Sequence, residues 1–168
     1  KIGINSLEVR LPEQLDDLDG IIIPGGESTT ISKLMDIYNI RTKLKDCIDN
    51  GLAVWGTCAG MILLAKYLEE PDPIPLQVMN ITVSRNAYGR QRDSFETDVN
   101  ITQLGPNPYH AVFIRAPKIT DIGSKVEILA SLQDGGPIAV RENNLLATSF
   151  HPELTNDLRF HSFFMGIV

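Results

Sequence analysis

The sequence predicts an α/β fold with three layers, in which helices flank a mostly parallel sheet. Two apolar runs, residues 20–23 and 52–55, are each followed by a glycine-bearing turn and a helical pattern. Strands without polar alternation are typical of parallel sheets covered on both faces. Strand and helix patterns alternate in the first third of the 168 residues, whereas the middle is rich in strands. We therefore expect additional antiparallel strands in the middle third.

Composition and charge limit the classes of function. Hydrophobic residues make up 43% and charged residues 21%, as in globular domains, and the formal net charge is −6. An acidic chain argues against nucleic acid as a partner. No apolar run approaches the ~20 residues of a membrane span, so we expect no membrane partner either. Cys47 and Cys58 form no disulfide framework, which favours a cytoplasmic protein. The three histidines and two cysteines lack paired ligand spacing, so we expect no metal and no cofactor.

The remaining elements are read in chain order from periodicity and turn residues. Residues 6–10 read as a short strand, although residues 1–4 could be a first strand instead. Asn143-Asn144 fits a hairpin turn between two later strands. The other expected elements are a helical turn at 12–18, helices at 31–39, 40–50, 59–68 and 156–168, a proline-rich connector at 70–75, and strands at 79–84, 94–101, 109–115, 126–132, 137–142 and 145–149.

Cys58 is the candidate nucleophile. It lies in the pentapeptide Gly-Thr-Cys-Ala-Gly at 56–60, directly after an apolar run and before a helical pattern. This is the cysteine version of a nucleophile elbow, a sharp strand-to-helix turn that presents the reactive side chain. Glycines on both sides admit backbone where a Cβ would clash, and a helix N-terminus favours a thiolate. The alternative is a buried structural cysteine.

A second glycine turn follows the first buried strand. Residues 24–30 read Pro-Gly-Gly-Glu-Ser-Thr-Thr. Gly25 and Gly26 allow a ligand to approach the backbone closely and let N–H groups point outward. Ser28 or Thr29 can cap the helix that follows. A plain turn with an N-cap is the alternative, and the turn lacks the Lys-Ser/Thr ending of a P-loop.

His151 and Glu153 follow the expected strand at 145–149. In parallel α/β sheets the ligand crevice lies outside the carboxyl ends of the strands, so His151 could meet Cys58 there. Glu153, two residues on, could then orient the imidazole. The alternative is a loop histidine before a helix, with Glu153 favourable at the helix N-terminus.

Together these groups suit acyl transfer. A Cys58 thiolate attacks a carbonyl and forms a covalent acyl-enzyme. His151 is the base, which later delivers a proton to the leaving amine, and Glu153 fixes its tautomer. The oxyanion needs N–H donors, each worth on the order of 3 kcal/mol in the barrier. The Ala59 N–H is one by elbow geometry, and the turn at Gly25-Gly26 can give the second.

With these residues assembled, the chain resembles the triad-type (class I) glutamine amidotransferases. The pentapeptide at 56–60 and the His-Pro-Glu at 151–153 match that wider family. More narrowly, the chain is similar to the glutaminase subunits of pyridoxal 5′-phosphate synthases. The matching segments cover nearly the whole chain and are residues 24–30, 85–91 (Arg-Asn-Ala-Tyr-Gly-Arg-Gln), 94–96, 113–117 and 150–155.

The resemblance implies a fold, a reaction and a partner. The fold is the flavodoxin-like class I glutamine amidotransferase fold. The reaction is hydrolysis of L-glutamine to L-glutamate and ammonia through a thioester on Cys58, with His151 and Glu153 completing a triad. The ammonia would pass through a tunnel to a synthase subunit that builds pyridoxal 5′-phosphate (vitamin B6). Many glutaminase copies would decorate a double-hexameric synthase core.

The resemblance also implies a glutamine pocket. An arginine can pair bidentately with the α-carboxylate of the substrate, which supports Arg85 as a ligand. The alternative for Arg85 is an ordinary surface ion pair. The implied pocket residues are Gly26, Glu27, Ser28, Arg85, Ile114 and Arg115.

We expect a single glutaminase domain over residues 1–168. Members of the family begin with a strand, a Leu-Gln-Gly-type loop and a helix, so we expect an N-terminal first strand and helix to be missing here. Two other functions compete with the glutaminase. One is another cysteine-elbow amidotransferase or hydrolase, against which the His-x-Glu arrangement argues. The other is a catalytically silent regulatory subunit of the same fold, against which the filled triad positions argue.

Overall fold

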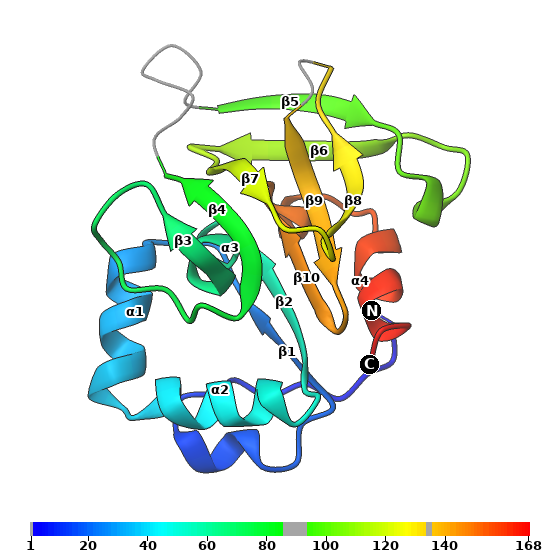
Figure 1. Ribbon diagram of the computed structural model, residues 1–168. Helices are drawn as coiled ribbons and strands as arrows, with labels where there is room; N and C mark the ends of the chain where they lie inside the picture. The colour runs from blue at the N-terminus through cyan, green and yellow to red at the C-terminus, as the bar shows by residue number, and fades with distance from the viewer. Residues whose placement is uncertain (1, 86–93, 134–135) are drawn as a thin grey trace.

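The computed structural model describes residues 2–85, 94–133 and 136–168. Its main sheet has five strands in the order β1-β2-β10-β9-β8 (Figure 1). β1, β2 and β10 are parallel neighbours, whereas β9 and β8 continue the sheet in antiparallel pairs. The predicted α/β class is confirmed, with parallel and antiparallel pairing mixed in one sheet. The strands are β1 Gly20–Ile23, β2 Ala53–Thr57, β8 Glu127–Ser131, β9 Pro137–Glu142 and β10 Leu145–Thr148.

Two smaller sheets and the helices complete the fold. One sheet has the order β3-β4-β7 and the other is the antiparallel pair β5-β6. Their strands are β3 Ala65–Leu68, β4 Met79–Ser84, β5 Ser94–Val99, β6 Tyr109–Ile114 and β7 Lys118–Ile122. The α-helices are α1 Ser28–Ile37, α2 Ile40–Asp49, α3 Ala59–Leu64 and α4 Arg159–Met165, and the 3₁₀ turns are η1 Pro12–Leu15, η2 Thr102–Leu104 and η3 Pro152–Leu154.

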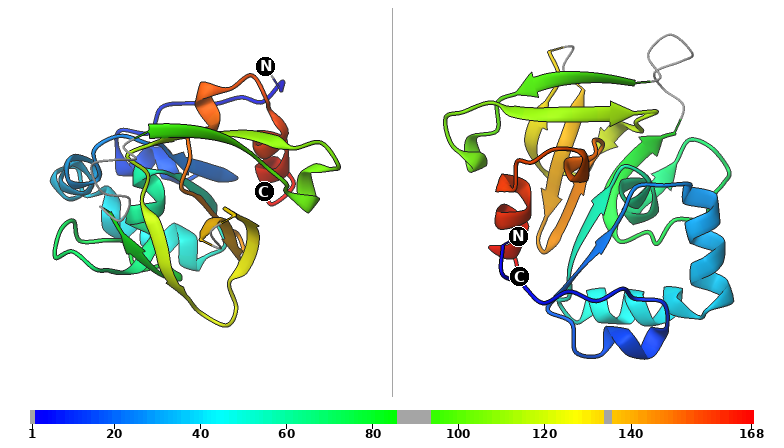
Figure 2. Two further views of the ribbon diagram at one scale, coloured as in Figure 1. Left: turned by 90° about the horizontal axis from the view of Figure 1, so that it is seen from above. Right: turned by 180° about the vertical axis from the view of Figure 1, so that it is seen from behind.

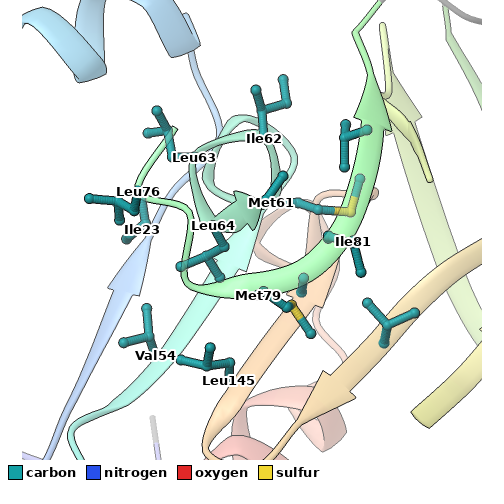
Figure 3. Packing of buried hydrophobic residues seen from close by; sticks show 14 of the residues in the cluster. Ile23, Val54, Met61, Ile62, Leu63, Leu64, Leu76, Met79, Ile81 and Leu145 are labelled. Atoms are coloured by element: carbon teal, nitrogen blue, oxygen red, sulfur yellow. The ribbon is translucent and has the colours of Figure 1, made fainter. Parts of the chain in front are cut away.

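Two apolar clusters cover the two faces of the main sheet. Neighbouring residues of one strand point to opposite faces, so Val54 and Ala147 enter one cluster while Trp55 and Leu146 enter the other. The first cluster packs α1, α2 and α3 against the sheet, and Figure 3 shows its side chains around α3 and β4. The second packs α4 and the β5-β6 pair, which lie on the side seen in the rear view of Figure 2. This makes the three expected layers.

The chain after the elbow corrects one expectation. We expected a helix to Leu68, but α3 ends at Leu64 and β3 begins at Ala65. β3 pairs with β4 through Ala65 and Met79. Tertiary strand pairing therefore overrides the helical spacing of the apolar residues.

Other expectations meet mixed outcomes. Residues 6–10 form no strand, so that prediction is wrong. The β9-β10 hairpin turns at Asn143, whose φ is 54°, so the predicted turn is confirmed. The final helix is shorter than expected, and an unpredicted strand, β7, pairs antiparallel with β4. No helix in the described part of the chain is long and apolar enough to cross a membrane.

Candidate active site

Three neighbouring parallel strands bring the predicted site residues together. β1 ends two residues before Gly25, β2 ends just before Cys58, and β10 ends three residues before His151. Because these strands are adjacent and parallel, their carboxyl ends meet at one edge of the sheet. A Cβ on Gly25 would lie 2.5 Å from His151 Cε1 and 3.6 Å from Cys58 Cβ. The glycine turn therefore lies directly against both side chains.

Cys58 has the strained backbone of a nucleophile elbow. Its φ is 49° and its ψ is −102°, a region that residues with a Cβ occupy at a cost of about 1–3 kcal/mol. The flanking glycines are required by close packing: a Cβ on Gly56 would lie 2.5 Å from the Gly60 backbone, and one on Gly60 would lie 2.0 Å from the Ile23 carbonyl oxygen. The Cys58 backbone N–H donates to the Thr148 carbonyl at 2.8 Å, which fixes the elbow to β10.

His151 lies between the cysteine and the carboxylate. Its Nδ1 is 2.7 Å from Glu153 Oε1, and its side chain is only 12% exposed. Its backbone N–H donates to the Val112 carbonyl of β6 at 2.8 Å. The interaction of its side chain with Cys58 is the main cause of its raised pKa. The histidine is thus oriented by Glu153 and anchored through its backbone.

His151 and Glu153 each favour the charged form of the other. The hydrogen bond with Cys58, followed by that with Glu153, raises the pKa of His151 to about 10. Partial burial opposes ionisation of Glu153, but its hydrogen bonds, first that with His151, outweigh burial and lower the pKa of its carboxyl group. At neutral pH, therefore, His151 is the protonated, positively charged imidazolium, and Glu153 is a carboxylate facing it.

The segments next to Cys58 carry backbone N–H groups. Ala59 is the first residue of α3, and the first N–H groups of a helix have no intrahelical partner. The Gly25-Gly26 turn carries two more N–H groups, with Gly26 at a φ of 142°. These are the donors expected for an oxyanion. The Cys58 N–H itself is committed to Thr148.

The N-terminus of α1 corrects the predicted cap. Glu27, not Ser28 or Thr29, is the N-cap residue. Its carboxylate accepts hydrogen bonds from the backbone N–H groups of Thr29 at 3.1 Å and Thr30 at 2.7 Å. The hydroxyl of Thr30, the largest contribution, and these N–H groups lower the pKa of Glu27 to about 2. Ser28 is buried as the first residue of the helix.

Arg85 joins the end of β4 to the start of α1. Its Nη2 lies 3.5 Å from Glu27 Oε1 and 3.4 Å from Thr29 Oγ1. The ion pair that was the alternative interpretation for Arg85 is thus present, and it places the guanidinium beside the turn that follows β1. The rest of the motif predicted at 85–91 lies outside the described residues.

Ile114, the last residue of β6, reaches the site. The Ile114 carbonyl oxygen is 4.0 Å from Cys58 Sγ, so this residue is in contact with the sulfur. Arg115 is exposed and has a φ of 43°, which marks a sharp turn at the end of β6. A hollow of about 400 Å³ opens between β5, β6 and Leu154, with Ile114 in its lining.

Some supporting groups had no signal in the sequence. The carbonyl oxygens of Thr148 and Val112 hold the backbones of Cys58 and His151, and any residue type can offer a carbonyl. The Thr148 hydroxyl also accepts from Trp55 Nε1 at 3.2 Å. Such contacts become visible only once the strands are paired.

The whole chain, residues 1–168, matches the model of the SNO glutamine amidotransferase family. It is 53% identical over 168 residues to the pyridoxal 5′-phosphate synthase subunit PdxT of Thermotoga sp. (strain RQ2), covering 100% of this chain and 89% of that protein. It is 54% identical over 166 residues to the PdxT subunit of Dehalococcoides mccartyi (strain 195), covering 98% of this chain and 85% of that protein.

Solved structures agree with this relationship. A crystal structure described as a glutamine amidotransferase superposes with a TM-score of 0.93 at 46% identity, covering 99% of this chain and 87% of that one. Another glutamine amidotransferase, from Thermotoga maritima, shares the fold at 10% identity and a TM-score of 0.57, covering 82% of this chain and 57% of that one. The chain therefore belongs to the SNO glutamine amidotransferase family, and the resemblance seen in its motifs is confirmed.

Proposed function

We propose that this chain hydrolyses L-glutamine to L-glutamate and ammonia and supplies the ammonia for pyridoxal 5′-phosphate synthesis. One observation carries the chemistry: Cys58, His151 with Glu153, and the Gly25 turn converge at the ends of three adjacent parallel strands. Family membership and the PdxT relatives at about half identity support the substrate and the pathway.

In the first half of the reaction Cys58 is the nucleophile. His151 holds the proton taken from the thiol, because the raised pKa of the imidazole keeps it protonated at neutral pH. Cys58 Sγ attacks the side-chain amide carbon of glutamine, and the negative charge on the amide oxygen is met by the N–H groups of Ala59 and the Gly25-Gly26 turn. The C–N bond then breaks, His151 passes its proton to the leaving nitrogen, and ammonia departs from a thioester.

In the second half of the reaction, water hydrolyses the thioester on Cys58. His151 removes a proton from the water, which attacks the thioester carbon. The C–S bond breaks, glutamate leaves, and His151 keeps the proton taken from the water, which restores the starting state of the pair. Glu153 keeps Nδ1 of the imidazole protonated and oriented through its 2.7 Å contact. Because Cys58 and His151 carry the nucleophilic attack and the proton transfers, and Glu153 holds the imidazole in place, we expect loss of any one to disable the cycle.

The glutamine is held by groups around the same edge. The α-carboxylate pairs with Arg85, whose guanidinium carries more N–H donors than its described contacts use. The backbone of Gly26, Glu27 and Ser28 borders the reacting end of the substrate. Ile114 and Arg115 close the pocket from β6.

The partner is a synthase subunit, which the name of the PdxT relatives indicates. We further propose that many copies of this chain sit on a double-hexameric synthase core, and that ammonia reaches the synthase through a tunnel. We place the protein in the cytoplasm, because both cysteines are free and a reducing compartment keeps the nucleophile a thiol. One glutaminase domain spans residues 1–168.

Glutamate release in the presence and absence of the synthase partner tests this function. We expect wild-type protein with its synthase partner to release glutamate, and Cys58→Ala to lose at least about a thousandfold of that rate, since the nucleophile is removed. Cys47→Ala is the matched control because Cys47 is the other free cysteine, and it should keep the wild-type rate.

Three outcomes would count against the proposal. Native glutamate release by Cys58→Ala would show that the nucleophile is elsewhere. Absence of release by the wild-type chain with its synthase partner would favour the silent regulatory role. Release of a different acid from another amide, with glutamine untouched, would favour another cysteine hydrolase.

A further inference from the structure

The connector between β3 and β4 reaches back to the end of β4. Glu70 Oε1 and Oε2 lie 2.9 and 3.1 Å from the backbone N of Arg85. The Ser84 hydroxyl lies 3.4 Å from Oε1. β4 ends at Ser84, so the first N–H beyond the strand is held by a carboxylate. Glu70 thereby fixes the backbone from which the Arg85 side chain starts.

The same connector also fixes the far end of Arg85. The Asp72 carbonyl oxygen accepts from Arg85 Nη1 at 2.6 Å, while Nη2 faces Glu27 and Thr29. The Arg85 side chain is 24% exposed. A guanidinium has five N–H donors, and the contacts described for Arg85 engage Nη1 and Nη2 but not Nε. The arginine is aimed by its own chain and keeps donors for a ligand.

The connector is itself anchored to the helices. Arg41 Nη1 donates to the carbonyl oxygens of Ile74 at 3.1 Å and Pro75 at 3.4 Å. Ser32 Oγ donates to the Ile74 carbonyl at 3.0 Å. Arg41, with a side chain only 17% exposed, is also paired with Asp36. Glu70 therefore acts from a braced segment and not from a free surface loop.

We infer that Glu70 is a positioning residue for glutamine, acting through Arg85. The inference rests on the proposed function, in which Arg85 pairs with the substrate α-carboxylate. A ligand-binding side chain needs supporting contacts that lock its position, and Glu70 holds the Arg85 backbone with both carboxylate oxygens. Removing that support leaves the guanidinium present but misplaced, so the loss falls on recognition of the α-carboxylate and not on the chemical step.

The test compares three substitutions in the complex with the synthase partner. Glu70→Ala removes the acceptor and Glu70→Gln keeps one oxygen. Glu69→Ala is the matched control, because Glu69 is adjacent, exposed and equally charged, and its side chain makes no hydrogen bond or ion pair among those described for residues 2–85, 94–133 and 136–168. For each protein, kcat and KM are measured with glutamine and with 4-aminobutanamide, which has the same amide but no α-carboxylate.

We expect Glu70→Ala to raise the KM for glutamine about tenfold, the effect of one lost hydrogen bond to a charged group. Its kcat should stay within about twofold, and kcat/KM for 4-aminobutanamide should not change. The ratio of kcat/KM for glutamine to kcat/KM for 4-aminobutanamide should therefore fall by about the same factor as the KM for glutamine rises. Glu70→Gln should fall between Glu70→Ala and wild type. Adding Glu70→Ala to Arg85→Ala should not lower kcat/KM for glutamine further, because Glu70 acts only through Arg85.

An unchanged glutamine preference in Glu70→Ala, with wild type active, would overturn the inference and leave the proposed function standing. Equal losses with both substrates, or an additive effect on top of Arg85→Ala, would also overturn it. An inactive wild type would instead remove the proposed function. If Glu70→Ala does not fold, Glu70→Gln must show the narrowed preference. Calorimetric affinity for glutamine in the Cys58→Ala background gives the same comparison without turnover, and an affinity unchanged by Glu70→Gln would count against the inference.

Discussion

The packed side of the site, around Cys58 and His151, and its proposed recognition side, around Glu27 and Arg85, are held by different kinds of contact. On the packed side, backbone touches backbone and the neighbouring glycines lie too close for a Cβ. The recognition side is held instead by hydrogen bonds in partly exposed positions. Steric packing permits almost no adjustment, whereas exposed polar contacts are individually weak. The side chains proposed to react are thus fixed by close packing, whereas the groups proposed for recognition are held by individually weak contacts.

The largest effect should come from the packed side. Gly60→Ala would place a Cβ 2.0 Å from the Ile23 carbonyl oxygen, and backbone must move to admit it. We expect the free energy of unfolding to fall by about 3 kcal/mol or more, with loss of glutamate release. Gly166→Ala is the control, since its Cβ would meet nothing nearer than 3.3 Å. Urea denaturation of both proteins measures the difference, and equal stabilities would contradict the packing account.

A smaller effect should appear where the glycine turn touches the histidine. In Gly25→Ala the new Cβ would lie 2.5 Å from His151 Cε1, so the imidazole must shift. A displacement near 1 Å can cost about a hundredfold in rate, and we expect kcat to fall by about that factor. The KM for glutamine should change little, because Arg85 is untouched. Steady-state kinetics with the synthase partner decide this, and a purely KM effect would place Gly25 on the recognition side.

The titration of His151 should report the contact with Cys58. Since that contact is the main cause of the raised pKa, Cys58→Ala should lower the His151 pKa well below its value of about 10. Glu153 should still hold it above the ordinary 6.5. Histidine NMR signals followed against pH measure both values, and an unchanged pKa in Cys58→Ala would mean that the two side chains do not interact.

The raised pKa of His151 also predicts how the stability of the fold changes with pH. The pKa of His151 is raised in the folded protein, so its contribution to stability is present in full below about 6.5 and declines as the pH rises toward 10. Wild-type protein should therefore lose more stability over that range than Cys58→Ala does. A larger loss of stability in Cys58→Ala than in wild type would contradict the assignment of Cys58 as the main cause of the raised His151 pKa.

The smallest effect belongs to the recognition side. Glu27→Ala removes the N-cap of α1, and a lost cap costs about 1 kcal/mol. The Glu27 pKa is lowered from 4.5 to about 2, so this contribution is present above about 4.5 and is lost as the pH falls toward 2. Glu27→Ala and wild type should differ in thermal unfolding at pH 7 and converge near pH 2. A difference that persists at low pH would point to a cause other than the carboxylate.

The packed side could largely be predicted from the sequence. Residues 20–23 and 52–55 are apolar runs of the kind that parallel sheets require, and glycines flank the elbow at 56–60. Since parallel strands end on one edge, placing Cys58 near His151 followed from strand direction alone. Steric constraints of this kind require particular residue types, such as glycine, which can be recognised in the sequence.

The recognition side could be predicted less well. Glu27 was missed as a cap because serine and threonine are more common there, yet Glu27 reaches two N–H groups. β3 was missed because Ala65–Leu68 continues an apolar helical pattern, and only pairing with β4 makes it a strand. Glu70 had no signal in the proline-rich connector, since its role depends on where β4 ends. Hydrogen bonds between distant segments leave little trace in local sequence.

Covalent labelling tests the central claim most directly. A glutamine analogue with a diazoketone in place of the side-chain amide alkylates the nucleophile that attacks it. After incubation with the synthase complex, mass spectrometry of the digested chain should find one adduct, on Cys58, and none on Cys47. Gly25→Ala should label more slowly, because its histidine is displaced. An adduct on Cys47, or no adduct on a chain that still binds glutamine, would contradict the assignment of Cys58 at this edge of the sheet.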